Sequence, residues 1–213
     1  MADSKKCMII AAVPLLSGEV FKEYNPKDFV VICADAGYET AQKYNIKPDY
    51  IVGDFDSAKK RPKVKGGNVH VLPVEKDVTD TMYAAMLGLE LGCRQFVIIG
   101  GVGGERNDHT FANYNVMVYI ANHGGFSVMV DDSSETFLLC GKKLTITGMR
   151  GKTVSVFPFG TNTCNLTYRG LKYPLNRQDL VVGDELMGVS NEIISDNAEI
   201  LVHFGCALVI VIK

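Results

Sequence analysis

Two different patterns of apolar and polar residues divide this chain. In the first part, short runs that are apolar throughout alternate with segments of helical periodicity, and unbroken apolar runs are typical of strands covered on both faces. The runs that predict strands are residues 8–13, 29–34, 50–52, 69–72, 96–99 and 126–130. Alternation of such strands with helices predicts an α/β domain with a mostly parallel sheet.

Helical periodicity is clearest in two segments between these strands. The first predicted helix has an apolar face made of Val78, Met82, Ala85, Met86 and Leu89. The second has a face made of Phe111, Tyr114, Val118 and Ala121. Gly92 ends the first helix, and Gly124 with Gly125 ends the second.

The pattern changes after about residue 133, where helical periodicity stops. Short β-rich runs separated by glycine follow, at residues 137–139, 144–146, 153–157, 165–168, 198–204 and 207–212. Their spacing predicts an antiparallel sandwich or barrel. We therefore expect two domains: an α/β domain over residues 1–133 and an all-β, sandwich-like domain over residues 134–213.

Composition and charge narrow the class of protein. The 213 residues are 47% hydrophobic and 22% charged, as in an ordinary soluble globular protein. A net charge of -2 gives no reason to expect a nucleic-acid or acidic-membrane partner, and no segment approaches the length of a membrane span. The six cysteines are dispersed without a C-x-x-C pair, so we expect buried thiols, no disulfide framework, no zinc site and a cytoplasmic location.

Aspartates follow several of the predicted strands, where ligands bind in an open α/β sheet. The turns in question contain Asp35, then Asp54 and Asp56, then Asp77 and Asp80, then Asp108. Any one of them alone could be a turn former or a helix N-cap. Together they would repel one another without a cation, and Mg²⁺ takes one or two carboxylates with waters and phosphate oxygens. The set therefore predicts a Mg²⁺-phosphate site.

A glycine-rich segment, residues 100–104, lies between a predicted strand and a predicted helix. Its backbone N–H groups and the helix N-terminus can hold phosphate, and Arg106 adds a forked donor. The segment matches neither the dinucleotide pattern G-x-G-x-x-G nor a P-loop. His109 follows, and it either contacts nucleotide or substrate or makes a structural hydrogen bond at the start of its helix.

Taken in order, these motifs resemble the signature of the thiamine pyrophosphokinases. In the first part they are Asp35-Ala36-Gly37, Gly53-Asp54-Phe55-Asp56-Ser57, Asp77-Val78-Thr79-Asp80 and Arg106-Asn107-Asp108-His109. In the second part they are residues 170–175, 189–192 and 205–210. The likeness spans nearly the whole chain. It implies an N-terminal catalytic domain that binds ATP and metal, and a C-terminal β-sandwich that binds thiamine and forms a homodimer with shared active sites.

The resemblance also implies roles for individual residues. Asp54, Asp56 and Asp80 hold Mg²⁺ and the polyphosphate, and Arg106 and Asp108 belong to the catalytic nucleotide-phosphate site. The remaining residues expected at the nucleotide are Asp35, Gly37, Lys76, Thr79, Gly103 and His109. The residues expected at thiamine are Tyr173, Ser190 and Asn191. Tyr173 stands where some members have tryptophan, and Lys76 stands where some have glutamine.

The expected reaction is attack of thiamine's hydroxyl on the β-phosphorus of ATP, with AMP as the leaving group. Such transfers depend on positioning and charge neutralisation. Asp80 or Asp56 orients or deprotonates the hydroxyl, and the sequence does not choose between them. Two alternatives remain open: a related pyrophosphokinase acting on another alcohol such as a pterin, or a non-catalytic sensor that binds thiamine or nucleotide.

Overall fold

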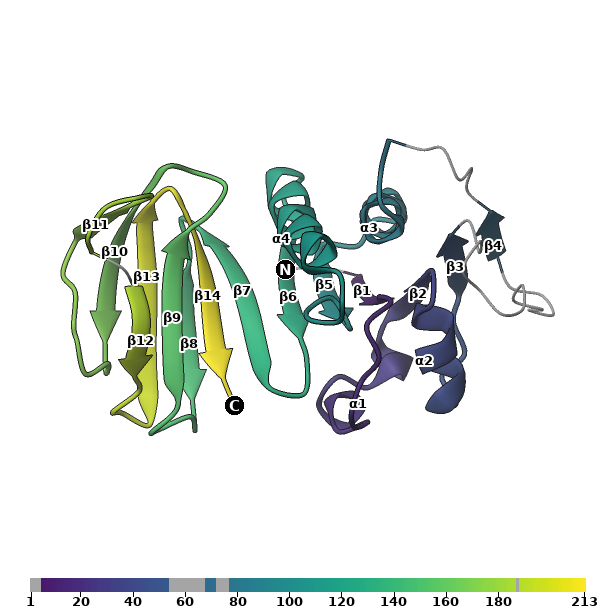
Figure 1. Ribbon diagram of the computed structural model, residues 1–213, viewed down its shortest axis with the longest axis horizontal. Coiled ribbons are helices and arrows are strands. Elements are labelled where there is room, and N and C mark those ends of the chain that lie inside the picture. Colours follow the sequence, from purple (N-terminus) through teal and green to yellow (C-terminus); the bar gives the residue numbers. More distant parts are fainter. Residues whose placement is uncertain (1–4, 54–67, 72–76, 187) are drawn as a thin grey trace. The chain divides into compact units, whose positions relative to one another are not determined.

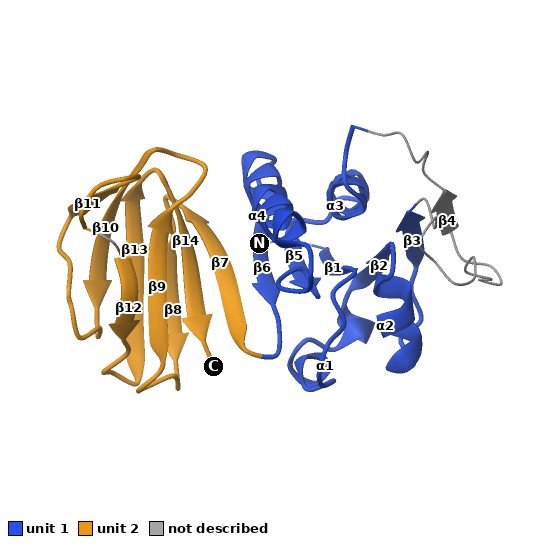
Figure 2. Ribbon diagram, viewed as in Figure 1, with its two compact units in different colours: residues 1–132 blue, residues 133–213 orange. Residues whose placement is uncertain are grey.

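The structure is a computed structural model that describes residues 5–53, 68–71, 77–186 and 188–213 (Figure 1). Contacts within the chain divide it into two compact units, Met1–Asp132 and Ser133–Lys213 (Figure 2). The first unit is an α/β domain with a parallel sheet, and the second is an antiparallel, sandwich-like β domain. Both halves of the predicted fold class are therefore confirmed.

Strands and helices alternate in the first unit. The strands are β1 (Lys6–Ile10), β2 (Val30–Ala34), β3 (Tyr50–Gly53), β4 (Asn68–Val71), β5 (Gln95–Ile99) and β6 (Phe126–Val130). The helices are α1 (Val20–Glu23), the 3-10 helix η1 (Pro26–Asp28), α2 (Gly37–Lys43), α3 (Asp80–Glu90) and α4 (Asn107–Asn122). The strands pair in parallel in the order β6-β5-β1-β2-β3-β4.

This strand order creates a switch point between β1 and β5. From β1 the chain steps outward in one direction to β4, and β5 and β6 then lie on the other side of β1. Because crossovers between parallel strands are right-handed, the change of direction places α1 and α2 on one face of the sheet and α3 and α4 on the other (Figure 1). Open α/β sheets bind ligands at such a point, beyond the carboxyl ends of the strands.

The first strand is shorter than the predicted run of residues 8–13, because β1 ends at Ile10. The chain still follows β5 beyond that residue. Ala11 N donates to Ile99 O at 2.7 Å and Val13 N donates to Gly100 O at 3.0 Å. The apolar run therefore continues past the strand as a segment that the glycine-rich loop holds in place.

The apolar face predicted for α3 is wrong, although the helix exists. Its buried residues are Thr81, Ala84, Ala85, Leu87 and Gly88, whereas Met82, Met86 and Leu89 are only half-buried. Small residues bring this helix close to the sheet: a Cβ at Gly88 would lie 2.6 Å from the ring of Phe96. The bulkiest apolar side chains therefore do not mark the buried face.

The face predicted for α4 is wrong for a similar reason. The helix buries Asn113, Val116, Met117 and Ile120. Phe111, from the predicted face, is 64% exposed. A buried polar residue, Asn113, takes a place on the inner face because its side chain has a backbone partner, which is described with the site below.

The second unit consists of two antiparallel sheets, in the orders β12-β9-β14-β7 and β11-β10-β13-β8. Its strands are β7 (Ser134–Cys140), β8 (Lys143–Thr147), β9 (Thr153–Pro158), β10 (Thr163–Arg169), β11 (Gln178–Val181), β12 (Gly188–Glu192), β13 (Asn197–Phe204) and β14 (Cys206–Ile212). Burial alternates along β9 and β13, as expected for sheets with one face on a core. The sequence did not predict the strands β11 and β12, which are edge strands with only one buried residue each.

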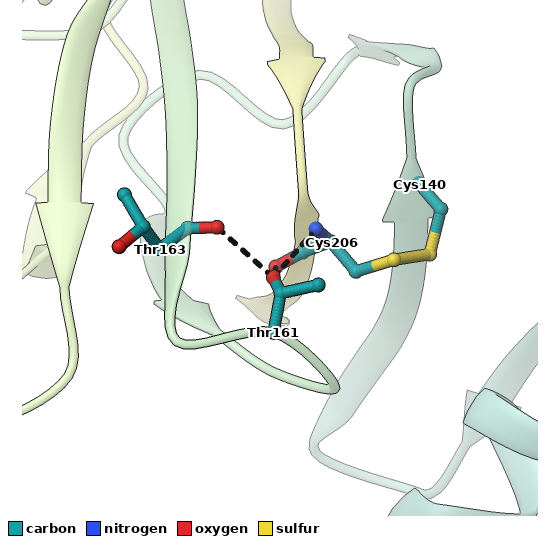
Figure 3. Close-up of a disulfide and its surroundings, with 4 residues drawn as sticks. All are labelled: Cys140, Thr161, Thr163 and Cys206. Atoms are coloured by element: carbon teal, nitrogen blue, oxygen red, sulfur yellow. Dashed lines mark hydrogen bonds between the residues drawn. A yellow bond between two sulfur atoms is a disulfide. The ribbon is translucent and has the colours of Figure 1, made fainter.

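One disulfide links the first and last strands of this unit, contrary to the expectation that the cysteines are thiols. Cys140 and Cys206 occupy paired positions on β7 and β14 and are 66 residues apart in sequence (Figure 3). Beside them, Cys206 N donates to the hydroxyl of Thr161 at 3.0 Å. The other four cysteines, Cys7, Cys33, Cys93 and Cys164, are buried and free, as predicted.

None of the helices in the described residues is long and apolar enough to cross a membrane.

Candidate functional site

A cavity of about 210 Å³ lies at the carboxyl ends of β1 and β2, beside the first turns of α3 and α4. Its lining consists of Ala12, Ala34, Asp35, Thr79, Asp80, Thr81, His109, Ala112 and Asn113. The sequence predicted four of these residues as site residues: Asp35, Thr79, Asp80 and His109. The two helix N-termini carry partial positive charge and the two aspartates carry negative charge, so this cavity suits phosphate oxygens together with a cation.

Asp35 enters the lining through an unusual backbone conformation. It follows β2 and has a φ of 47°, which places a non-glycine residue in the left-handed region. Its backbone N–H donates to Val52 O at 2.9 Å and so ties the turn to β3. Residues held in this region are often found at ligand sites, where the surrounding structure enforces them.

Thr79 fixes the start of α3. It is the N-cap residue, and its hydroxyl oxygen accepts a hydrogen bond from Met82 N at 3.2 Å. This cap sets the first helical residue at Asp80, which is half-buried. The sequence motif predicted Thr79 and Asp80, whereas Thr81, buried in the next position, was missed because it carries no motif.

The glycine-rich loop is held by contacts on both of its sides. Gly100 has a φ of 69°, and a Cβ there would lie 2.5 Å from Val13 O, so this position requires glycine. Asn113 Nδ2 donates to Gly101 O at 2.7 Å, and Gly103 N donates to the hydroxyl of Thr110 at 3.1 Å. Asn113 is 6% exposed and lines the cavity, yet sequence reasoning missed it. No local signal in the sequence marked it, because the predicted inner face of this helix did not include Asn113.

Arg106, the N-cap residue of α4, pairs with Asp108 in the first turn of the same helix. Arg106 Nε donates to Asp108 Oδ1 at 2.9 Å, and Arg106 Nη2 donates to Asp108 Oδ2 at 2.6 Å. Hydrogen bonding from the guanidinium lowers the pKa of Asp108 to about 2, and the same bonds raise the pKa of Arg106. Both side chains are exposed. In the described residues, neither Arg106 nor Asp108 lines the cavity. Their role at the nucleotide therefore stays a prediction.

His109 lines the same cavity from the first turn of α4. Its side chain is exposed, and its backbone N–H donates to Arg106 O at 3.1 Å. Of the two predicted roles, the position beside the cavity favours contact with a ligand.

Gly37, predicted at the nucleotide, has a packing role. It is the first residue of α2, and a Cβ there would lie 1.9 Å from Ile10 O. Glycine therefore allows α2 to approach the end of β1. Within the described residues, Gly37 and Gly103 are not part of the cavity lining, so their nucleotide contacts also stay predictions.

Asp54, Asp56 and Lys76 lie outside the described residues, so the predicted three-aspartate site is not visible. Among the residues that are described, no group of three His, Cys, Asp or Glu side chains is placed to hold a metal ion. Asp35 and Asp80 do line one cavity together with Thr79. Oxygen donors of this kind, with few carboxylates, fit Mg²⁺, which keeps several waters and takes phosphate oxygens.

The three residues predicted at thiamine lie together in the second unit. Tyr173 is 62% exposed, and Ser190 and Asn191 are on β12. Asn191 Oδ1 accepts from Tyr173 N at 3.0 Å, and Asn191 Nδ2 donates to Tyr173 O at 2.8 Å. Lys172 lies with its ammonium 6.0 Å from the centre of the Tyr173 ring and pairs with Glu192 at 3.0 Å. An exposed aromatic ring is thus presented beside an ion pair.

Comparison with known proteins agrees with this arrangement. The family model described as "Thiamin pyrophosphokinase, catalytic domain" matches residues 21–130, and the model described as "Thiamin pyrophosphokinase, vitamin B1 binding domain" matches residues 142–209. The thiamine pyrophosphokinase of Bacillus subtilis (strain 168) is 28% identical over 187 residues, covering 85% of this chain and 84% of that protein.

Solved structures agree as well. The crystal structure of thiamine pyrophosphokinase from Bacillus subtilis has a TM-score of 0.86 at 25% identity and covers 98% of this chain and 99% of that chain. The crystal structure of thiamin pyrophosphokinase from Geobacillus thermodenitrificans has a TM-score of 0.81 at 26% identity, with 98% and 97% covered. Since both family models match in order and the first alone spans more than half of the residues, this chain belongs to the thiamin pyrophosphokinase family of enzymes.

Proposed function

We propose that this protein transfers the pyrophosphoryl group of ATP to the hydroxyl of thiamine, giving thiamine diphosphate and AMP, with Mg²⁺ as cofactor. The observation that carries the proposal is the cavity at the carboxyl ends of β1 and β2, where Asp35, Thr79 and Asp80 meet the N-termini of two helices. Helix N-termini bind phosphate, and carboxylates beside them bind a hard cation.

The nucleotide phosphates bind along the loop between β5 and α4. Gly103 lies in this loop, where its N–H donates to the Thr110 hydroxyl, and Arg106 offers a forked guanidinium that suits phosphate oxygens. Asp108 holds that guanidinium through two hydrogen bonds. Lys76, Gly37 and His109 belong to the same proposed nucleotide site.

Asp80, with Asp54 and Asp56, would hold Mg²⁺, which when bound would supply positive charge opposite the phosphates. Asp80 or Asp56 orients the thiamine hydroxyl or accepts its proton. The hydroxyl oxygen forms a bond to the β-phosphorus, while the bond from that phosphorus to the α,β-bridging oxygen breaks. AMP leaves with that oxygen.

The thiamine end of the site belongs to the second unit, at Tyr173, Ser190 and Asn191. The ring of Tyr173 is exposed and offers a flat face to a ring of the substrate. We include in the proposal a homodimer with shared active sites and a cytoplasmic location. The dimer is proposed from the resemblance; its interface would cover some of the large apolar side chains that are exposed in the described part of this unit, among them Val182, Leu186, Val189, Ile194, Phe204 and Ile212.

An assay of AMP release separates this proposal from its two alternatives. The protein is incubated with ATP and Mg²⁺, together with either thiamine or a hydroxymethyl pterin. The proposal predicts AMP release that depends on thiamine. AMP release with the pterin only would indicate the related pyrophosphokinase, and thiamine binding without AMP release would indicate a sensor. Either of these results would refute the proposed function.

A further inference from the structure

The side chain amide of Asn191, in the second unit, is hydrogen-bonded to the backbone of Tyr173. Asn191 is 7% exposed, and it bonds both polar backbone groups of Tyr173: Oδ1 accepts from the N–H at 3.0 Å and Nδ2 donates to the C=O at 2.8 Å. In an antiparallel sheet, a residue of the partner strand makes the same two bonds with its backbone C=O and N–H; here a side chain amide makes them.

The carbonyl oxygen of this amide has a second partner. Asn191 Oδ1 also accepts from Glu192 N at 2.9 Å. A carbonyl oxygen has two lone pairs, so both are in use, and two N–H donors also fix which end of the amide is oxygen. A substrate that bonded to Oδ1 would have to break a hydrogen bond within the chain.

The backbone of β12 is distorted in a way that buries this amide. The register with β9 shifts between Gly188 and Asn191, and Ser190 between them has a φ of 58°. Ser190 N donates to the hydroxyl of Ser155 at 3.0 Å rather than to a strand carbonyl. Bulges of this kind re-aim side chains next to functional sites. Here Ser190 is exposed and Asn191 is buried.

The segment that carries Tyr173 is otherwise paired with the end of β12 through its backbone. Lys172 N donates to Glu192 O at 2.9 Å, and Ile194 N donates to Gly170 O at 3.0 Å. Pro174 follows Tyr173 and restricts it to extended conformations. The backbone of Tyr173 is therefore held while its ring is 62% exposed.

We propose that Asn191 is a positioning residue that acts through Tyr173 and does not itself bind thiamine. It fixes the Tyr173 backbone so that the ring is already in place when the substrate arrives, which lowers the cost of ordering the site on binding. This inference rests on the proposed function. It revises the role that the resemblance implies for Asn191 and leaves Ser190 as the polar group that faces the substrate.

A double-mutant cycle tests whether Asn191 affects thiamine binding through Tyr173. In the wild-type background, Asn191→Ala should raise the KM for thiamine about tenfold, the scale for losing a pair of ordinary hydrogen bonds, with the KM for ATP unchanged. In the Tyr173→Ala background the same change should raise it less than about twofold, because residues that act as a unit are not additive. Full additivity of the two substitutions would mean direct contact with thiamine and would overturn the proposal.

The matched control is Asn165→Ala in the same unit. Asn165 also uses its side chain amide on a backbone carbonyl, donating to Arg177 O at 3.0 Å, and it lies on β10, which pairs with β11 and β13. Its substitution should leave the KM for thiamine within about twofold of wild type, since its amide bonds to Arg177 and Asp179 rather than to the residues proposed at thiamine. A tenfold rise in this control would show that any loss of an amide in this unit affects binding, and it would overturn the specific role of Asn191.

Hydrogen exchange of the Tyr173 amide, followed by NMR, tests the positioning part without any assay of activity. Asn191→Ala should speed exchange at Tyr173 at least about tenfold, while the Lys172 amide, bonded to Glu192 O, changes less. Asn191→Asp keeps the size and the acceptor for Tyr173 N but loses the donor to Tyr173 O, so it should speed Tyr173 exchange and raise the KM for thiamine, each by less than Asn191→Ala does; it also serves if the alanine variant does not fold. Unchanged exchange at Tyr173 in Asn191→Ala, or a raised KM in a folded Asn191→Asp whose Tyr173 exchange is unchanged, would refute the positioning role. Absence of thiamine turnover in the wild type would refute the proposed function instead, with the exchange result unaffected.

Discussion

Arg106 and Asp108 are joined by two parallel hydrogen bonds, from Nε to Oδ1 at 2.9 Å and from Nη2 to Oδ2 at 2.6 Å. The pair is at the N-terminus of α4, which favours negative charge: Arg106 is the N-cap residue and Asp108 lies in the first turn. A phosphate that binds there meets a guanidinium held in one orientation, and it competes with the Asp108 carboxylate for the same donors.

The pH dependence of this pair follows from the pKa of Asp108, which falls from 3.8 to about 2. A lowered carboxyl pKa stabilises the fold above the ordinary value, and this contribution is lost as pH falls toward the folded value. The difference in thermal midpoint between wild type and Asp108→Asn should therefore be constant from about pH 8 to 5 and shrink between about pH 4 and 2. Both side chains are exposed, so the difference will be small. A difference that already shrinks near neutral pH would contradict the assignment.

Asp80→Asn should lower turnover on the order of 10²-fold, the scale for losing one preorganised electrostatic group. Asp80 lines the cavity at the first turn of α3, and the amide has nearly the same size, so folding should be retained. Asp54→Asn is expected to act in the same direction. The measurement is initial rate against Mg²⁺ concentration, with Asp28→Asn, an exposed residue of η1, as the control. Wild-type rates for Asp80→Asn at limiting Mg²⁺ would exclude it from the metal site.

Gly37→Ala should destabilise the first unit by about 1–3 kcal/mol or more, as overpacking does. Its Cβ would lie 1.9 Å from Ile10 O, a backbone atom that can move only with the strand. Gly103→Ala is the comparison, because Gly103 has a φ of 85° and, its two chain neighbours aside, no atom of the described residues lies within 4 Å of the added Cβ, so backbone strain is the expected cost. Urea unfolding measures both. A midpoint for Gly37→Ala equal to that of wild type would mean that α2 does not approach β1 this closely.

Thiol counting tests the disulfide between Cys140 and Cys206. Four thiols should react after denaturation without reductant, and six after reduction, since four cysteines are free. In the folded protein these four should react slowly, because all are buried and burial raises the pKa of Cys33 to about 12 and of Cys164 to about 11. Six reactive thiols in protein that was denatured without reductant would show that the two strands carry thiols.

The sequence predicted those parts of the fold in which the apolar pattern is strong. Strands such as β5, apolar throughout because helices cover both faces, were found within a residue or two. The edge strand β12 was missed because its one buried residue, Asn191, is polar. The buried faces of α3 and α4 were misassigned because Ala84, Gly88 and Asn113 form them in part. Periodicity of large apolar residues does not detect a helix that packs through small or polar ones.

The candidate site likewise contains residues that the sequence predicted and relationships that it did not. Asp35, Thr79 and Asp80 were predictable because each follows a strand of a parallel sheet, and those ends meet at one edge. Three relationships depend on tertiary structure and have no local signal: the bond from Asn113 to the glycine-rich loop, the bulge that turns Asn191 toward Tyr173, and the pairing of cysteines 66 residues apart. Each is set by strand register or helix rotation, which a sequence pattern does not fix.

The products formed from thiamine and ATP test the central claim most directly. Purified protein is incubated with both substrates and Mg²⁺, and all nucleotides and thiamine phosphates are quantified by chromatography over the course of the reaction. The proposed attack on the β-phosphorus predicts thiamine diphosphate and AMP in equal amounts, with neither appearing when thiamine is left out. Formation of thiamine monophosphate and ADP would place the attack on the γ-phosphorus and contradict the account, as would the absence of any phosphorylated thiamine.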